Sequence, residues 1–188
     1  MEKDAMKIVK MDLACLAALA CAALPTASFA ALQASGGSAT FDASGPAGFH
    51  IQGKTSDVTV AESGGNVTVN VGLANLDTGI DVRNRHMRDK YLEVQKFPAA
   101  TLVVARSALK VPADGQASDG SASGTMTIHG QSHPVSFTYK AKQDHGSFDV
   151  SGSVHIDMKE YGINVPSYLG ITVKPGIDIA VHYVAHDV

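Results

Sequence analysis

The chain has 188 residues, enough for one domain with a leader, and 18% of them are charged. A net charge of −3 gives no global basic field to hold a nucleic-acid backbone or an anionic membrane surface, so no nucleic-acid partner is expected. Eighteen glycines and no tryptophan are typical of a β-rich domain with many turns and not of a helical bundle.

Residues 1–30 predict a cleaved signal peptide. A mostly basic start precedes an apolar segment over 13–24, which is shorter than the roughly 20 residues of a membrane-spanning helix. Ser28 and Ala30 supply the small residues of a signal-peptidase site. Cleavage is therefore expected near Ala30, giving a periplasmic or secreted protein with no transmembrane segment.

Both cysteines, Cys15 and Cys21, lie in this leader, so the mature domain is expected to contain no thiol, disulfide or cysteine metal ligand. The alternative is that Cys21 is a lipidated N-terminus. The intact mass of the exported protein distinguishes a start at Cys21 from a start at Ala31.

The mature chain reads mainly as β-strand. Residues 34–38 are small, and the segment 31–38 is expected to form a flexible lead-in, with the domain over 39–188. Apolar and polar residues then alternate at period two, which is typical of strands with one buried face. Residues 112–123 are rich in Gly, Ser and Ala and predict a solvated loop. Strand-like alternation covers 39–43, 49–55, 58–60, 67–73, 101–106, 125–129, 135–142, 148–158 and 177–183, and we expect these stretches to form roughly eight strands.

Residues 79–98 form a dense block of mixed charge. Within it, a short helix is predicted over 85–94, with Met87, Tyr91 and Val94 as its apolar stripe. A barrel has two open ends, and such a helix would plug one of them. Its stripe is the part expected to touch a ligand.

The charges of this block alternate in sign, which predicts a mutually satisfied ion network that seats the helix. Arg85 and Asp89 stand four apart and are expected to pair on its surface, an interaction worth about 0.3 to 0.5 kcal/mol. Arg83 is the charged residue expected to face inward, because it stands where the preceding strand meets the helix.

Long alternating strands joined mostly by short turns favour a closed architecture. A two-sheet sandwich and a barrel both hide one apolar face of every strand. Closure also removes the exposed edges of long strands. An all-β, antiparallel, eight-stranded up-and-down barrel is therefore favoured, and the sandwich is the alternative.

The inward positions are apolar and include no catalytic group, so no enzyme is predicted. No metal site is predicted either, because His129 and His133 flank a turn with no Cys, Asp or Glu at ligand spacing beside them. The residues expected to line the interior are Phe49, Ile51, Val69, Val71, Met87, Tyr91, Val94, Phe97, Phe137, Tyr139, Phe148, Val150, Ile156 and Tyr183.

Three segments together resemble the YceI-like family of secreted, lipocalin-like lipid-binding proteins. Residues 81–98 contain Asp-Val-Arg-Asn and a closing Lys-Phe-Pro; residues 124–135 form a strand that ends in His-Gly before Pro-Val; residues 158–163 carry an aromatic-Gly-Ile turn. The family's usual opening is not recognisable around 40–53, and the segment 166–175 is unusual for the family.

The resemblance implies a lipocalin-like barrel that holds an isoprenoid, a quinone or another long-chain lipid for transport, storage or stress protection. Each methylene moved from water into such a pore is worth about 0.8 kcal/mol. A polar head would be met at the mouth by Arg83, His129, Tyr161 or Tyr168. No cofactor besides this lipid is expected, and a homodimer is left open.

Two other functions compete with lipid binding. A structural or protein-interaction β-domain would have a filled core, and an enzyme would need a polar cluster inside the barrel. The volume and lining of the interior separate the three.

Overall fold

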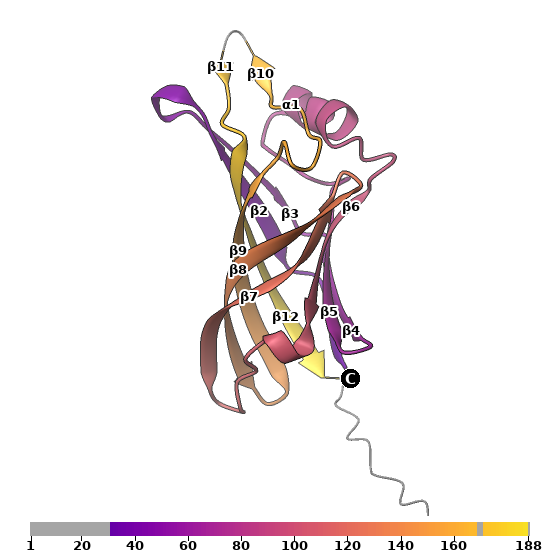
Figure 1. Cartoon of the computed structure of the whole chain (residues 1–188), viewed down its shortest axis with the longest axis vertical. Helices are drawn as coiled ribbons and strands as arrows, with labels where there is room; N and C mark the ends of the chain where they lie inside the picture. The colour runs from indigo at the N-terminus through magenta and orange to yellow at the C-terminus, as the bar shows by residue number, and fades with distance from the viewer. Residues whose placement is uncertain (1–30, 169–170, 188) are drawn as a thin grey trace, which may run out of the picture.

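The structure, a computed structural model, describes residues 31–168 and 171–187, so the predicted signal peptide and both cysteines lie outside the described residues. Within that part of the chain, eight strands form an antiparallel meander that closes when the last strand pairs with the first (Figure 1). The predicted eight-stranded up-and-down barrel is confirmed. Its strands, in ring order, are β1 (Leu32–Ser35), β4 (Val58–Ser63), β5 (Asn66–Gly72), β6 (Ala99–Ala105), β7 (Ala117–Ile128), β8 (Gln131–Asp144), β9 (Ser147–Asp157) and β12 (Gly176–Asp187).

The prediction of a flexible lead-in over 31–38 is wrong. Leu32 and Gln33 pair with the end of β12, and residues 33–35 pair with β4, so β1 is the strand that closes the barrel. Leu32 and Ala34 point inward and are buried. Four residues of alternation among small side chains are too few to reveal a strand whose partners lie far away in the sequence.

Two further strands extend the wall beyond the closed ring. The strand is interrupted at Gly36 and Gly37. The chain then continues as β2 (Ser38–Ser44) and returns through the short helix η1 (Pro46–Gly48) and β3 (His50–Thr55). A side chain at Gly37 would place its Cβ 2.6 Å from the carbonyl oxygen of His182, so the break requires glycine. This hairpin reaches past the barrel rim (Figure 1).

A helical segment lies across the same end of the barrel. Helix α1 (Asp81–His86) continues without a break into a π-helical turn, η2 (Met87–Tyr91). The helix thus begins four residues before the predicted start at Arg85 and ends three residues before Val94. The small hairpin of β10 (Ser167–Tyr168) and β11 (Ile171–Thr172) lies at this end too (Figure 1). We call it the helix end.

The opposite end carries the β4–β5 and β8–β9 turns and the short helix η3 (Arg106–Ala108). Strand β7 begins at Ala117, so much of the predicted loop 112–123 belongs to the barrel wall. Its small residues have a packing role: Gly120 pairs with Tyr139, and a Cβ there would lie 3.2 Å from the tyrosine oxygen. The small residues that made this segment look like a loop instead leave space for the Tyr139 ring.

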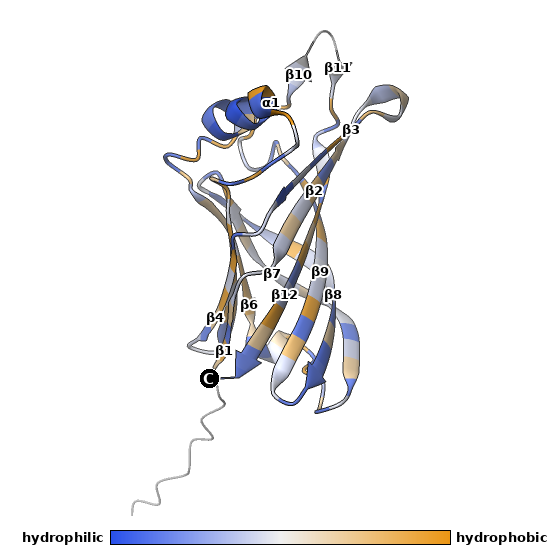
Figure 2. Ribbon diagram, turned by 180° about the vertical axis from the view of Figure 1, so that it is seen from behind, coloured by the Kyte–Doolittle hydropathy of each residue, from blue (hydrophilic) through white to orange (hydrophobic). Residues whose placement is uncertain are grey.

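Apolar and polar residues alternate along the strands, as the banding in Figure 2 shows. The inward residues pack as two buried clusters. One, near the helix end, includes Met126, Ile156 and Tyr161; the other, near the opposite end, includes Val60 and Phe148. A search of the described residues for a helix long and apolar enough to span a membrane finds none.

Candidate functional site

The barrel interior contains a cavity of about 740 Å³. Its volume falls within the roughly 300 to 1,000 Å³ of typical small-molecule sites. All eight strands of the ring contribute to its lining, and most of the side chains that face it are apolar. The described residues therefore do not form the filled core that is expected of a purely structural domain.

The cavity stays open because several inward positions of β9 and β12 carry small or β-branched residues. Val150, Gly152 and Val154 face it from β9, and Val181 faces it from β12. A Cβ built on Gly152 would meet only the carbonyl oxygen of Thr138, at 3.6 Å, so the space in front of this glycine is empty. Larger residues at these positions would fill the interior.

Most of the predicted lining residues do face the cavity. These are Phe49, Ile51, Val69, Val71, Met87, Tyr91, Phe137, Tyr139, Phe148, Val150, Ile156 and Tyr183. Val94 and Phe97 do not line it, contrary to prediction. The helix ends at Tyr91, Glu93 takes a left-handed conformation with φ of 44°, and the chain turns away.

The π-helical turn gives the helix end its apolar surface. Met87 and Tyr91 both stand on this turn and line the cavity. Such turns are rare and occur frequently at functional sites. The sequence spacing of four correctly placed both residues on one face, although it did not reveal the wider helical turn.

Arg83 also lines the cavity, as predicted, and its guanidinium is held in place. Its Nε donates a hydrogen bond to Thr78 Oγ1 at 2.8 Å, and its Nη2 donates to the Thr78 carbonyl oxygen at 2.6 Å. The positive charge of Arg83 is therefore held in a fixed place near the start of α1, where the segment that follows β5 joins the helix.

Asn84 is the buried polar residue that organises this connection. Its Oδ1 accepts hydrogen bonds from the Thr78 backbone N–H and hydroxyl, and its Nδ2 donates to Asp77 Oδ1 at 2.7 Å. Hydrogen bonds from the Gly79 backbone N–H and from Asn84 lower the pKa of Asp77. The network locks residues 77–84 into one arrangement.

The predicted ion network of 79–98 is not found. Among the described residues, the ion pairs of this block are Glu93 with Lys96, at 2.7 Å, and Glu93 with His129, at 3.0 Å. Arg85 and Asp89 do not pair. The helix is instead positioned by the hydrogen bonds of Asn84 to Thr78 and Asp77 and by the apolar side chains of Met87 and Tyr91.

The opposite end of the cavity carries polar groups that sequence reasoning missed. Arg106 and Lys110 line it there. Arg106 Nε lies 3.2 Å from Glu62 Oε2, and the Glu62 side chain is only 11% exposed. The Tyr139 hydroxyl accepts a hydrogen bond from the Lys110 backbone N–H at 2.6 Å. The partners Glu62 and Arg106, and the partners Lys110 and Tyr139, are far apart in sequence and are brought together by the order of strands β4 to β8 in the sheet.

Tyr183 projects into the same end. Burial raises the pKa of its phenol to about 12, although the nearby Arg106 acts in the opposite direction. The cavity therefore has a neutral phenol and a cation near one end and Arg83 at the other, with an apolar wall between them.

A family model for the YceI-like domain matches residues 31–185. The chain belongs to the YceI-like family. Comparison with functionally curated proteins gives no match.

Solved structures with the same fold support the architecture. A polyisoprenoid binding domain from Saccharophagus degradans is 18% identical, with a TM-score of 0.70 over 85% of this chain and 99% of that one. Burkholderia cenocepacia BcnA is 16% identical, with a TM-score of 0.59 over 78% and 95%. A Campylobacter jejuni YceI protein is 17% identical, with a TM-score of 0.52 over 73% and 85%. At these identities the likeness shows the fold alone.

The three YceI-like segments of the sequence meet at His129, in the β7–β8 turn. Its Nε2 lies 3.0 Å from Glu93 Oε2, its Nδ1 lies 3.2 Å from the Tyr161 carbonyl oxygen, and its ring packs on Phe97 at 4.7 Å. Hydrogen bonds from Lys96 and then from His129 lower the pKa of Glu93. His129 thus ties the segment after the helix to two turns of the barrel wall.

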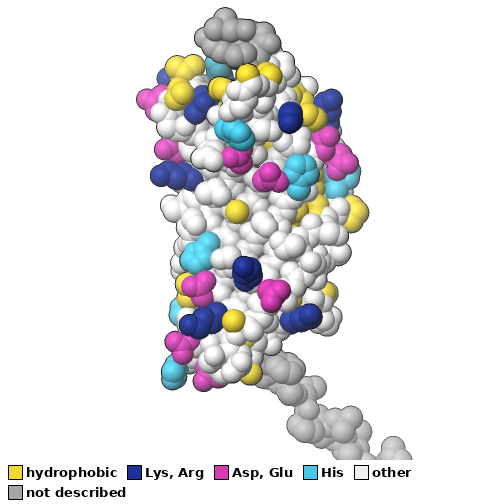
Figure 3. All heavy atoms as spheres, turned by 90° about the vertical axis from the view of Figure 1, so that its left-hand side faces the viewer, with side chains coloured by type: hydrophobic (Ala, Val, Ile, Leu, Met, Phe, Trp, Pro, Cys, Tyr) yellow, Lys and Arg dark blue, Asp and Glu magenta, His cyan; other side chains and the backbone are white. Residues whose placement is uncertain are grey.

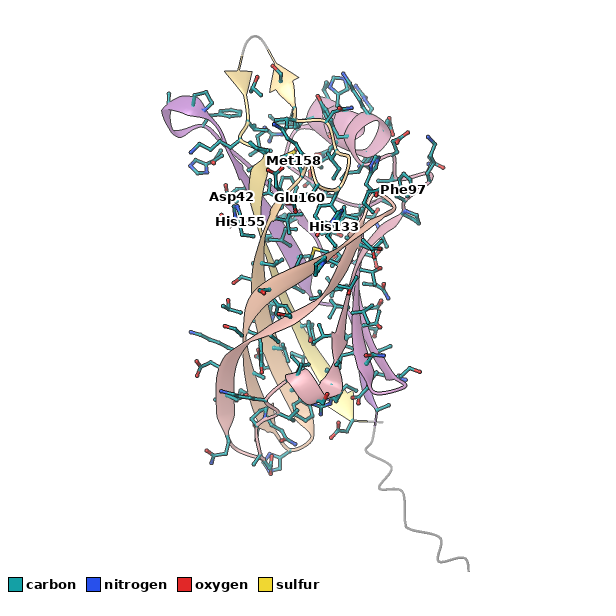
Figure 4. The ribbon with its side chains drawn as sticks, in the orientation of Figure 1. Asp42, Phe97, His133, His155, Met158 and Glu160 are labelled. Atoms are coloured by element: carbon teal, nitrogen blue, oxygen red, sulfur yellow. The ribbon has the colours of Figure 1, made fainter. Side chains whose placement is uncertain are left out.

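His129 and Tyr161 are therefore not at the polar mouth where the family resemblance placed them, because neither lines the cavity. Tyr161 is fully buried, its ring packs on His133 at 5.1 Å, and its hydroxyl has no hydrogen-bond partner among the described residues. Phe97 and His133 lie near the β7–β8 turn in Figure 4. The side chain of Tyr168 lies outside what the structure describes.

Proposed function

We propose that this YceI-like protein holds one long-chain lipid, an isoprenoid, an isoprenoid quinone or an acyl chain, inside the barrel. The observation that carries the proposal is the apolar cavity of about 740 Å³. Each methylene moved into it from water contributes about 0.8 kcal/mol, so a chain of a few isoprene units binds tightly without a hydrogen bond. The Saccharophagus degradans domain of the same fold is described as polyisoprenoid-binding, which agrees with this ligand class.

The polar groups at the two ends of the cavity suit an amphiphile. Arg83 has two of its guanidinium nitrogens committed to Thr78, which fixes the group at the lip. A head group with an anionic or carbonyl oxygen would be met there, or by Tyr183 and Arg106 at the other end. The chain would lie along the apolar wall.

We also propose that the protein acts outside the cytoplasm, because residues 1–30 have the pattern of a cleaved leader. The intact mass of protein isolated from its own host tests this. A start near Ala31 supports cleavage near Ala30, a diacylated Cys21 start supports lipid anchoring, and a retained leader overturns the proposal.

Mass spectrometry of an organic extract tests the ligand class. Protein purified from its host is expected to release a polyprenyl, quinone or fatty-acyl compound in about equimolar amount. An empty protein that also fails to take up a polyprenyl alcohol, a quinone and a fatty acid would overturn the proposal.

A variant that fills the cavity provides a sharper test. Gly152→Phe places a ring in the empty space before Gly152. It should weaken lipid binding about 100-fold or more, because the ring displaces several methylenes worth about 0.8 kcal/mol each. Gly152→Ala is the matched control, expected to change binding little. Equal affinity in Gly152→Phe and the wild type would place the ligand elsewhere.

A further inference from the structure

We propose that the helix end of the barrel docks on the surface of a bilayer containing anionic phospholipid. This inference goes beyond lipid holding: it assigns a membrane-facing surface, and it does not depend on which lipid fills the cavity. It rests on exposed apolar residues at the cavity mouth and on unpaired cations beside them.

The apolar part is formed by Phe49, Ile80 and Val82. These side chains are 39%, 52% and 51% exposed, and they also line the cavity. They come from two separate segments, the turn before β3 and the entry into α1, which both lie at the helix end. Each of these side chains therefore meets both solvent and the cavity. Exposed apolar residues grouped in this way mark interaction surfaces.

The basic part is the helix itself. Between Asp81 and Tyr91 the segment carries four basic and two acidic side chains, in a chain of net charge −3. None of the four basic residues forms an ion pair within the described part of the chain. Lys90 instead lies over the Tyr91 ring, 5.6 Å from its centroid. Figure 3 shows the side of the molecule away from α1, where basic, acidic and hydrophobic side chains are interspersed at the upper end.

The opposite end carries exposed charges of both signs. Its loops and strand ends present the acids Asp114, Asp144 and Asp187 together with the basic residues Lys110 and Lys142. The negative net charge of the chain means that the protein as a whole is not attracted to an anionic membrane. Salt, however, limits the reach of each charge to about 8 to 10 Å. Within that distance the helix end presents a cationic rim, so an anionic surface favours one orientation of the barrel.

A bilayer fits this surface better than a protein partner does. Cations beside exposed apolar side chains are the arrangement by which proteins lie at a lipid interface, with the cations on head-group phosphates. The apolar residues here also line the cavity, so hydrocarbon in contact with them is next to the cavity mouth. A protein partner at the same face is an outcome that the experiment distinguishes.

Vesicle flotation tests the proposal on the full chain. The probes are vesicles of phosphatidylcholine alone and vesicles containing about one third phosphatidylglycerol. The charge variant is Arg85→Gln with Lys90→Gln; both residues are exposed and neither lines the cavity. The matched control is Lys140→Gln with Lys142→Gln, on exposed positions of β8. Every variant keeps the same N-terminal segment.

We expect the wild type to prefer the anionic vesicles and to lose this preference in high salt. The Arg85/Lys90 variant should bind them about 10- to 30-fold more weakly, and the Lys140/Lys142 control less than about threefold more weakly. Val82→Ser should weaken binding to the same vesicles severalfold, since it removes apolar surface at the mouth.

Equal losses in the two double variants would overturn the proposal, as would absence of binding to anionic vesicles. Crosslinking from position 85 to another envelope protein, without vesicle binding, would assign the surface to a protein partner instead. Uptake of a polyprenyl alcohol, measured without vesicles, distinguishes failure of docking from failure of lipid holding, because Arg85 and Lys90 lie outside the cavity.

Discussion

At the helix end, the hydrogen bonds that position the start of α1 lie within one short stretch, where Asn84 binds Thr78 and Asp77, while apolar side chains at the mouth remain exposed. At the opposite end, Glu62 of β4 and Arg106 beyond β6 form a poorly exposed ion pair, and the Leu32 backbone N–H of β1 donates to the same carboxylate at 3.4 Å. That end links strands that are distant in sequence.

The difference assigns different tasks to the two ends. Contacts of the Glu62 kind stabilise closure of the barrel, so losing them should affect the whole fold. Contacts of the Asn84 kind position a local segment over the mouth, so losing them should affect that segment and the entry of ligand. The predictions below rank these effects from the largest to the smallest.

Arg106→Met should destabilise the protein by about 3 kcal/mol, because it leaves the Glu62 carboxylate poorly exposed and unpaired. Chemical denaturation measures the free energy of unfolding. The double variant Glu62→Gln with Arg106→Met should recover part of the loss, because no charge is then left without its partner. A double variant no more stable than the single one would contradict the assignment.

Asn84→Ala should cost about 2 kcal/mol, since the Thr78 backbone N–H and hydroxyl lose their acceptor in a buried position. Hydrogen exchange should increase mainly over residues 77–91. Asn70→Ala is the control, because Asn70 accepts one hydrogen bond, from Thr101 at 2.8 Å. Uniform loss of protection around the barrel would show that the two ends are not independent.

Tyr183→Phe should remove an alkaline loss of stability. The folded protein has a raised Tyr183 pKa of about 12 against 10.0 for an unperturbed tyrosine, so the folded state holds the proton more tightly. The stability from this difference is complete below pH 10 and is lost as the pH rises through 12. At pH 11 the wild type should have lost on the order of 1 kcal/mol that the variant retains. Thermal melts from pH 8 to 12 measure it, with Tyr91→Phe as control; identical pH profiles of wild type and Tyr183→Phe would refute it.

Glu93→Gln should have the smallest effect, at acid pH. Contacts with Lys96 and His129 lower the pKa of Glu93 below 4.5. The stability that these contacts give the folded protein is present above pH 4.5 and is lost as the pH falls through the lowered pKa of Glu93. The melting temperature of the variant should therefore fall less than that of the wild type between pH 6 and 3. Glu160→Gln is the control, since Glu160 forms no ion pair among the described residues. A Glu93→Gln pH profile equal to that of the wild type would count against the contacts of Glu93.

Much of the cavity wall could be predicted because side chains alternate strictly along a strand. Once Val69, Val71, Phe148 and Val150 are assigned to one face, closure of the sheet places them inside together. The spacing of Met87 and Tyr91 was enough to place both on the ligand side of the helix. Val94 was misplaced because the helix ends before it.

The sequence by itself determined that the chain is an antiparallel barrel of the YceI-like type, since period-two alternation and the three segments are local patterns. Only the tertiary structure decided how large the cavity is and which polar groups stand at its ends. The volume depends on which small residues, such as Gly152, and which rings, such as Tyr139, stand side by side on neighbouring strands of the wall. The pairing of Glu62 with Arg106, and of β1 with β12, joins residues far apart in sequence, and no local pattern records such contacts.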